Sequence, residues 1–172
     1  PFGTLAHAGP MTRTVADAAL MLTVIANPDT RDWHALPHDG ADYSSTLDGN
    51  IDGLKVALCP TLGLNTRIDE EVAEAVANAA QQFSDLGASV ERIELNWPTP
   101  PRDVIQTLFT SSAAKLISML TDEQQDQIEP SLLTMAAEGR KLDMMSLKTA
   151  ELDRTANGIY MNHMLAKYDV LL

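Results

Sequence analysis

The sequence predicts an α/β fold, and three observations support this prediction. Residues 54–95 have the pattern of a strand, a helix and a second strand, which together form a βαβ unit. Residues 96–167 repeat apolar side chains at helical spacing. The chain has 172 residues, of which 45% are hydrophobic and 21% charged, as in a folded domain. We expect the two strands to be parallel and their crossover right-handed.

The first element is a helix that follows a turn within residues 1–27. Thr14 stands where a helix-capping hydroxyl is favoured, and Asp17 adds negative charge to the first turn. Apolar residues continue to Ile25, and Pro28 disfavours helix at the residue before it. Because apolar side chains lie nearly all round this helix, we expect it to be buried inside a larger body.

Residues 28–53 form a long loop, rich in Asp, Gly, Pro and Ser. Asp48–Gly53 resembles the first half of an EF-hand calcium loop, but Cys59 occupies the position that needs a bidentate carboxylate. His34 and His38 have the spacing of a metal-binding pair, but Pro37 between them excludes the helix that makes this spacing useful. We therefore expect no metal and no cofactor.

The βαβ unit occupies residues 54–95. Residues 54–59 are a short apolar strand that Pro60 closes. Asp69 can cap the following helix, and Gly87 supplies a left-handed residue at its end. Residues 88–95 alternate apolar and polar side chains, which is typical of a second strand.

Residues 96–167 form a helical layer. Pro101 suits a first helical position, Thr121 with Gln124 is a capping box, and Pro130 restarts the helix. The last helix runs from about residue 146 to 167, and its expected core contacts are Leu152, Ile159, Tyr160 and Met164. Residues 168–172 resemble the start of a strand.

Composition narrows the possible partners and location. The formal charge of −12 opposes direct binding of nucleic acid, and Cys59 alone cannot form an intrachain disulfide. No apolar run is long enough to span a membrane and no signal peptide is evident, so we expect a cytoplasmic protein. The chain begins at Pro1 and ends in an apolar Val170–Leu172, which favours a truncated piece over a terminal strand docked at a sheet edge.

No catalytic constellation is evident from the residues alone. Nucleophilic catalysis needs a Ser, Cys or Thr beside a base, usually on a tight glycine-rich turn. Ser44-Ser45 have no adjacent glycine, Ser111-Ser112 lie within a predicted helix, and Cys59 belongs to an apolar strand. We therefore assign no catalytic residue in this chain.

Residues 2–20 nevertheless resemble the amidase signature family, in the segment that follows its catalytic loop. The resemblance rests on Gly9-Pro10-Met11, then Thr12-Arg13-Thr14-Val15, then Asp17 ahead of an apolar helix. It continues more sparsely through Asp29, Asp32 and residues 53–56, 69–72, 86–90 and 168–172. The resemblance implies an α/β/α fold of which residues 1–172 are a single internal piece.

The resemblance also implies an activity. Members of this family hydrolyse carboxamides with a Ser, cis-Ser, Lys triad, which lies upstream of the segment that matches Pro1. Neither Lys55 nor Lys115 matches the family's lysine, and no Gly-Gly-Ser-Ser string is present. The isolated chain is therefore expected to be inactive.

Two groups of residues are candidates for roles in the parent enzyme. Leu108 and Phe109 are candidates for an apolar wall of the acyl pocket, with ordinary core packing as the alternative. The remaining candidates are structural and belong to the N-terminal motif: Gly9, Pro10, Met11, Arg13, Thr14 and Asp17.

Three functions remain open. The parent is either an amidase acting on a small-molecule amide or the glutaminase-like subunit of a tRNA-dependent amidotransferase, and the third possibility is a non-catalytic acidic interaction module. A cut sheet would expose strand edges and apolar surface, so we expect a homo-oligomer or a swapped dimer of this chain.

Overall fold

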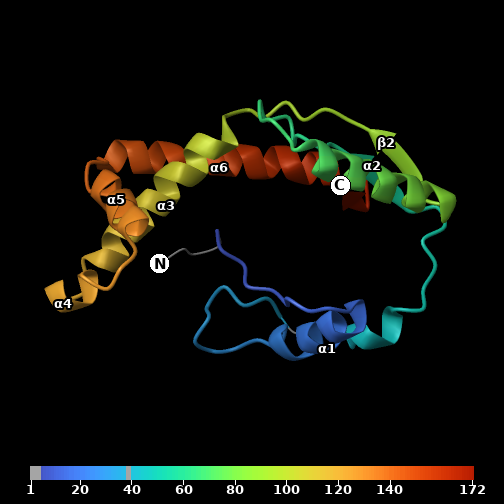
Figure 1. Ribbon diagram of the computed structural model, residues 1–172, viewed down its shortest axis with the longest axis horizontal. Coiled ribbons are helices and arrows are strands. Elements are labelled where there is room, and N and C mark those ends of the chain that lie inside the picture. The colour runs from blue at the N-terminus through green and yellow to red at the C-terminus, as the bar shows by residue number, and fades with distance from the viewer. Residues whose placement is uncertain (1–4, 38–39) are drawn as a thin grey trace. The chain divides into compact units, whose positions relative to one another are not determined.

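The computed structural model describes residues 5–37 and 40–172. It divides into two compact units, the first from Gly3 to Asn50 and the second from Ile51 to Leu172. The first unit holds the N-terminal motif and a long loop. The second holds a parallel sheet and most of the helices, so the architecture is mixed α/β as expected (Figure 1).

The first unit is built around α1 (Val15–Ile25), which packs on the short 3-10 helix η1 (Tyr43–Thr46). Thr14 caps α1, because its side-chain oxygen accepts the backbone N–H of Asp17 at 3.1 Å. The backbone N–H of Tyr43 donates to Thr23 Oγ1 at 3.1 Å, which ties η1 to α1.

Within its own unit α1 is only partly buried, and its expected burial inside a larger body stays a prediction. Ala19 is buried, whereas the apolar side chains of Leu20, Val24 and Val15 are more than half exposed. The short η1 is too small to cover a helix that is apolar all round.

Three parallel strands form the sheet, in the order β2-β1-β3. They are β1 (Lys55–Leu58), β2 (Ser89–Arg92) and β3 (Val170–Leu171). Val56 of β1 pairs with Val90 on one side and with Val170 on the other. Val56 and Ala57 are completely buried, so the central strand is covered on both faces.

Helix α2 (Glu70–Asp85) connects β1 to β2 and packs against β2 (Figure 1). Asp69 caps its start, where the carboxylate accepts the backbone N–H of Glu71 at 3.0 Å. Gly87 follows its end with φ of +95°, the left-handed conformation that the sequence predicts there. A β-carbon on Gly87 would lie 2.6 Å from Asp52 Oδ1, so the Asp52 side chain would have to move to make room for one.

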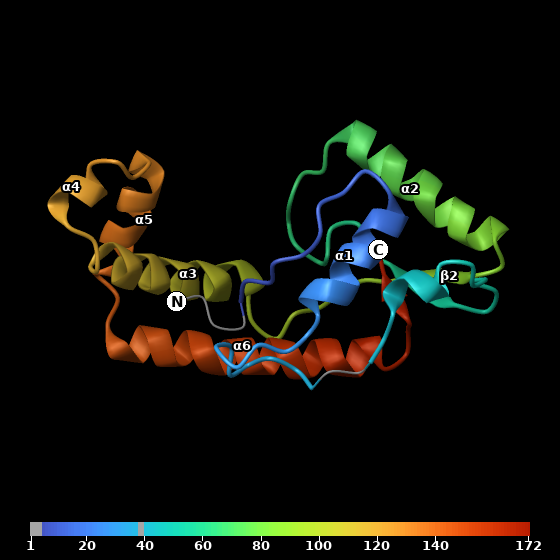
Figure 2. The same cartoon turned by 90° about the horizontal axis from the view of Figure 1, so that it is seen from below.

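Four helices form the layer after β2. They are α3 (Pro101–Ile117), α4 (Asp122–Gln125), α5 (Pro130–Gly139) and α6 (Met144–Leu165). Helix α3 packs against both α5 and α6, and Figure 2 shows α3 running alongside α6. The predicted capping box of Thr121 and Gln124 is present at the start of α4.

The core of this layer lies between α3 and α5. Ala113, Ile117 and Ala136 are almost fully buried, and leucine, isoleucine and methionine side chains pack around them. The predicted face of α6 is correct only in part: Tyr160 and Met164 are half-buried, whereas Leu152 and Ile159 are 71% and 54% exposed. Ala150 and Asn157 are the buried residues of α6, so a small and a polar side chain occupy its most buried positions.

A polar junction joins the segment after β2 to α6. The phenol oxygen of Tyr160 accepts the backbone N–H of Asn96 at 2.8 Å, and Asn157 Oδ1 accepts the N–H of Thr99 at 3.3 Å. The Trp97 ring lies beside that of Tyr160, with centroids 5.8 Å apart.

Of the helices in the described segments, none combines the length and the apolar character that a bilayer crossing requires.

Candidate functional site

The N-terminal motif leads into α1 as an extended, exposed segment. Met11 is 96% exposed, and Thr12 Oγ1 donates to the carbonyl oxygen of Thr14 at 2.8 Å. Thr14 in turn caps α1 through the N–H of Asp17. Within the described segments Arg13 and Asp17 form no ion pair, so the order in this motif comes from threonine hydroxyls.

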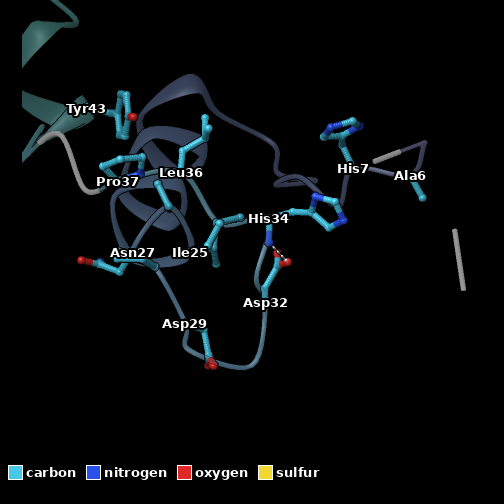
Figure 3. A pocket seen from close by; sticks show the side chains of 13 residues that line it. Ala6, His7, Ile25, Asn27, Asp29, Asp32, His34, Leu36, Pro37 and Tyr43 are labelled. Carbon is cyan, nitrogen blue, oxygen red and sulfur yellow. Dashed lines mark hydrogen bonds between the residues drawn. The ribbon is translucent and has the colours of Figure 1, made fainter. Parts of the chain in front are cut away.

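The first unit contains a pocket of about 610 Å³ beside the end of α1 (Figure 3). One part of its wall is apolar and comes from Ile25, Leu36 and Pro37. Polar side chains also line it, among which Asp32 and His34 lie on one side in Figure 3. Because Leu36 is 81% exposed and Ile25 45% exposed, this pocket is an open depression at the surface of the unit.

Local hydrogen bonds order the loop that forms this pocket. Asp32 Oδ1 accepts the backbone N–H of His34 at 2.9 Å, and the rings of Trp33 and His34 lie 4.1 Å apart. The carboxylate of Asp29 pairs with the Arg31 guanidinium at 2.6 Å. The Arg31 side chain, and next its backbone N–H, lower the pKa of Asp29, which keeps that carboxylate ionised.

The same pocket brings together His7 and His34, two residues that no sequence pattern associates. Across the described ranges, 5–37 and 40–172, no three His, Cys, Asp or Glu side chains gather closely enough to hold a metal ion. The spacing of His34 and His38, which we do not expect to bind a metal, involves His38, and this residue lies outside the described residues.

The serine and cysteine side chains considered as nucleophiles are engaged in local hydrogen bonds or buried in the fold. Ser111 Oγ donates to the carbonyl oxygen of Leu108 at 2.8 Å within α3. Ser44 Oγ donates to Asp42 Oδ1 in the turn that begins η1. Cys59 is 3% exposed and follows β1, as expected for a packed thiol.

Leu108 and Phe109, the candidates for an acyl-pocket wall, are neighbours on α3 with different exposure. Leu108 is buried in the helical layer, at 8% exposure, whereas Phe109 is half-buried. Of the two, Phe109 therefore keeps the larger share of accessible surface. Leu108 already packs as a core residue does.

A second crevice lies where β1 and β2 end, and sequence reasoning did not identify it. Residues 59–61, 63–65 and 92–96 line it, with Arg92 and Glu94 among them. The available signal was the predicted pair of parallel strands, because ligands often bind outside the carboxyl ends of such strands.

Comparison with known proteins gives a consistent result. The Amidase family model matches residues 2–172. An acylamidase from Rhodococcus erythropolis is 29% identical over 172 residues, which make up 99% of this chain and 36% of that protein. The A subunit of glutamyl-tRNA(Gln) amidotransferase from Streptococcus pneumoniae (strain 70585) is 43% identical over 95 residues, or 55% of this chain and 19% of that protein.

Solved structures match along almost the whole chain. A bacterial aryl acylamidase described as an amidase signature enzyme has a TM-score of 0.80 at 26% identity, over 95% of this chain and 35% of that one. The 6-aminohexanoate cyclic dimer hydrolase has a TM-score of 0.73 at 18% identity, over 91% and 34% of the two chains, and this likeness concerns the fold alone. The chain thus spans about a third of the length of the acylamidase and of the aryl acylamidase that it matches.

Proposed function

The chain belongs to the Amidase family, and we propose that it is part of an enzyme that hydrolyses carboxamide C–N bonds to a carboxylate and ammonia or an amine. The family match over residues 2–172 carries this proposal. The TM-score of 0.80 with an aryl acylamidase supports it, because the two folds agree over 95% of this chain.

The catalytic groups of that enzyme belong, in this proposal, to residues outside 1–172. The resemblance to amidase signature enzymes implies a Ser, cis-Ser, Lys triad in a glycine- and serine-rich loop, and this sequence has no Gly-Gly-Ser-Ser string. Ser111 Oγ is bonded within its own helix, which gives no support for a nucleophile there. Residues 1–172 alone are therefore expected not to hydrolyse amides.

The decisive experiment is to determine the reading frame that contains this sequence, express its product and assay it on simple arylamides. We expect a Gly-Gly-Ser-Ser string upstream of Pro1, amide hydrolysis by the product, and loss of hydrolysis when its candidate nucleophilic serine becomes alanine. A reading frame that begins next to Pro1 would contradict the amidase proposal and favour an acidic interaction module.

Phe109 is proposed as the residue of this chain that contacts the acyl part of the substrate. In the whole protein, Phe109→Ala should raise KM several-fold for bulky acyl groups and leave acetanilide nearly unaffected, because only a bulky group reaches the ring. Leu108→Ala is the matched variant. Since Leu108 is buried, its loss should lower the free energy of unfolding by about 2–5 kcal/mol without changing acyl preference. Equal effects on all substrates would contradict the role of Phe109.

A second candidate is the glutaminase-like subunit of a tRNA-dependent amidotransferase. The 43% identity over 95 residues with the Streptococcus pneumoniae protein favours it locally, whereas the acylamidase match extends over the whole chain. Affinity purification from the source cell separates the two, because an amidotransferase subunit copurifies with its partner subunits in fixed ratio and a stand-alone amidase does not.

A further inference from the structure

The crevice at the ends of β1 and β2 is an open pocket with exposed polar side chains in its lining. Its volume is about 360 Å³, within the range of small-molecule pockets. It lies entirely in the second unit and is lined by the segments that follow two adjacent parallel strands. The carboxyl ends of parallel strands are the usual place for ligands in open α/β sheets.

The loop on one side of this crevice is held in place by hydrogen bonds. Trp97 Nε1 donates to the carbonyl oxygen of Leu62 at 2.6 Å, and the N–H groups of Leu62 and Leu64 donate to Cys59 and Thr61 carbonyls at 2.9 Å. Leu62 has a φ of 50°, which is unusual for leucine. Such a loop is ordered before any ligand arrives, so binding costs little conformational entropy.

Close packing fixes the same loop against the segment after β2. Gly63 has a φ of +67°, and a β-carbon there would overlap the backbone carbonyl of Leu95. Leu95 itself is 3% exposed. The two walls of the crevice therefore touch at Gly63, and their separation is set by backbone contact rather than by flexible side chains.

The lining carries one positive and one negative side chain. Arg92 and Glu94 are two positions apart where β2 ends, a spacing that places side chains on the same face of an extended segment. Among the residues that the structure describes, neither has an ion-pair partner within 4.0 Å, and they do not pair with each other. Asn65, Asn96 and Thr61 add uncharged hydrogen-bonding groups to the same lining.

A ligand for this crevice must satisfy both charges. A simple anion would pair with Arg92 but meet the Glu94 carboxylate, and a simple cation would meet the opposite conflict. A guanidinium binds a carboxylate through two parallel hydrogen bonds, while a carboxylate accepts hydrogen bonds from an ammonium group. We propose that this crevice binds a small zwitterion of the amino-acid class, with its carboxylate on Arg92 and its ammonium on Glu94.

The test is a titration of residues 1–172, labelled with ¹⁵N, with ω-amino acids from glycine to 6-aminohexanoate. Acetate and methylammonium are the single-charge probes. We expect saturable shifts of the Asn65 and Asn96 side-chain amides, with one chain length of the series binding best. Each single-charge probe should bind about tenfold more weakly than that compound, because it makes only one charge-assisted contact.

Charge-removing variants connect this binding to the two residues. Arg92→Gln and Glu94→Gln should each weaken binding of the best zwitterion about tenfold. Arg67→Gln, which removes an exposed positive charge outside the crevice lining, should leave it unchanged. An unchanged dispersion of amide signals in each variant confirms that the fold is retained.

Four results would overturn the proposal. The first is the absence of a saturable shift at ligand concentrations up to about 20 mM, where even weak binding would be detected. The second is binding of acetate or methylammonium as tight as that of the best zwitterion. The third is unchanged binding in both Arg92→Gln and Glu94→Gln, and the fourth is an equal loss of binding in Arg67→Gln. The proposal does not depend on amide hydrolysis, so its failure leaves the proposed function untouched.

Discussion

A β-carbon on Gly139 of α5 would overlap the carbonyl oxygen of Thr110 on α3, so the two helices cross with their backbones in contact. The same β-carbon would lie 3.0 Å from the Cβ of Ala114, also on α3. Gly139 is buried at this crossing. Its missing side chain therefore determines how closely α5 approaches the core residues of α3.

Gly139→Ala should lower the free energy of unfolding by about 1–3 kcal/mol, because the added methyl group forces the helices apart. Gly158→Ala is the matched control, since a β-carbon there meets open space on α6. That variant should instead raise the free energy of unfolding by about 0.5–1 kcal/mol, because alanine favours helix over glycine. Urea denaturation measures both, and equal effects would contradict the close crossing.

Substitutions on the two sides of the contact between Asn157 and Thr99 should have opposite effects on stability. Asn157 is 7% exposed and accepts the Thr99 N–H, whereas Thr99 Oγ1 is buried without a hydrogen-bond partner among the described residues. Asn157→Ala should cost about 1–3 kcal/mol, since it leaves the N–H unsatisfied. Thr99→Val should be neutral or stabilising in the same thermal or urea unfolding measurement. A destabilising Thr99→Val would show that this hydroxyl is bonded.

Tyr168 is expected to titrate above the ordinary tyrosine range. Its phenol donates to Glu91 Oε2 at 2.8 Å, and this hydrogen bond, followed by desolvation and the Glu91 charge, raises the pKa of Tyr168. The pKa of Tyr168 in the folded chain exceeds the unfolded value of about 10, so the contact stabilises the fold below a pH of about 10. This stabilisation is lost as the pH rises through the raised pKa.

Glu91→Gln should move the pKa of Tyr168 back towards about 10, as measured by the pH dependence of the Tyr168 ring signals in NMR. Glu74→Gln removes a carboxylate on α2 that has no bond to Tyr168 and serves as the control. A Tyr168 pKa that does not differ between Glu91→Gln and the unchanged chain would contradict the contact.

Self-association of residues 1–172 is expected from the exposed apolar side of α1. Leu20 and Val24 are 61% and 66% exposed and lie one helical turn apart. The mass measured by light scattering after size exclusion should rise with concentration, and Leu20→Ser with Val24→Ser should reduce this rise. Val72→Ser, at a single exposed site on α2, should not. A monomer at every concentration would show that this face does not associate.

The βαβ unit could be predicted because its signals are local. Asp69 accepts a backbone N–H at the start of α2, and Gly87 has positive φ after its end, as the residue types indicate. The pairing of β1 with β3 joins Val56 to Val170, far apart in sequence. Nothing local specifies that register, so the sequence predicted a strand there but not its neighbour.

The orientation of helices was less predictable. Leu152 and Ile159 were expected in the core of α6, yet Ala150 and Asn157 occupy the inward face. Apolar residues lie on several sides of α6, and their spacing therefore favours no single face. The inward Asn157 is explained by its bond to Thr99, a tertiary contact that no periodicity encodes.

The candidate sites were predicted only in part. Periodicity placed Leu108 and Phe109 on one helix, but their different exposure depends on how α3 packs with α5 and α6. The lining of the β1–β2 crevice brings together residues 59–61, 63–65 and 92–96, which meet only after the parallel strands pair. Such convergence follows from topology and is invisible to local motifs.

The most direct test compares amide hydrolysis by residues 1–172 with hydrolysis by the product of the whole reading frame, at equal molar concentration and on the same arylamide. The proposed role predicts release of the aromatic amine by the whole protein and no release above buffer by residues 1–172. Hydrolysis by residues 1–172 that a serine-directed inhibitor abolishes would contradict it, because a nucleophile would then lie within this chain.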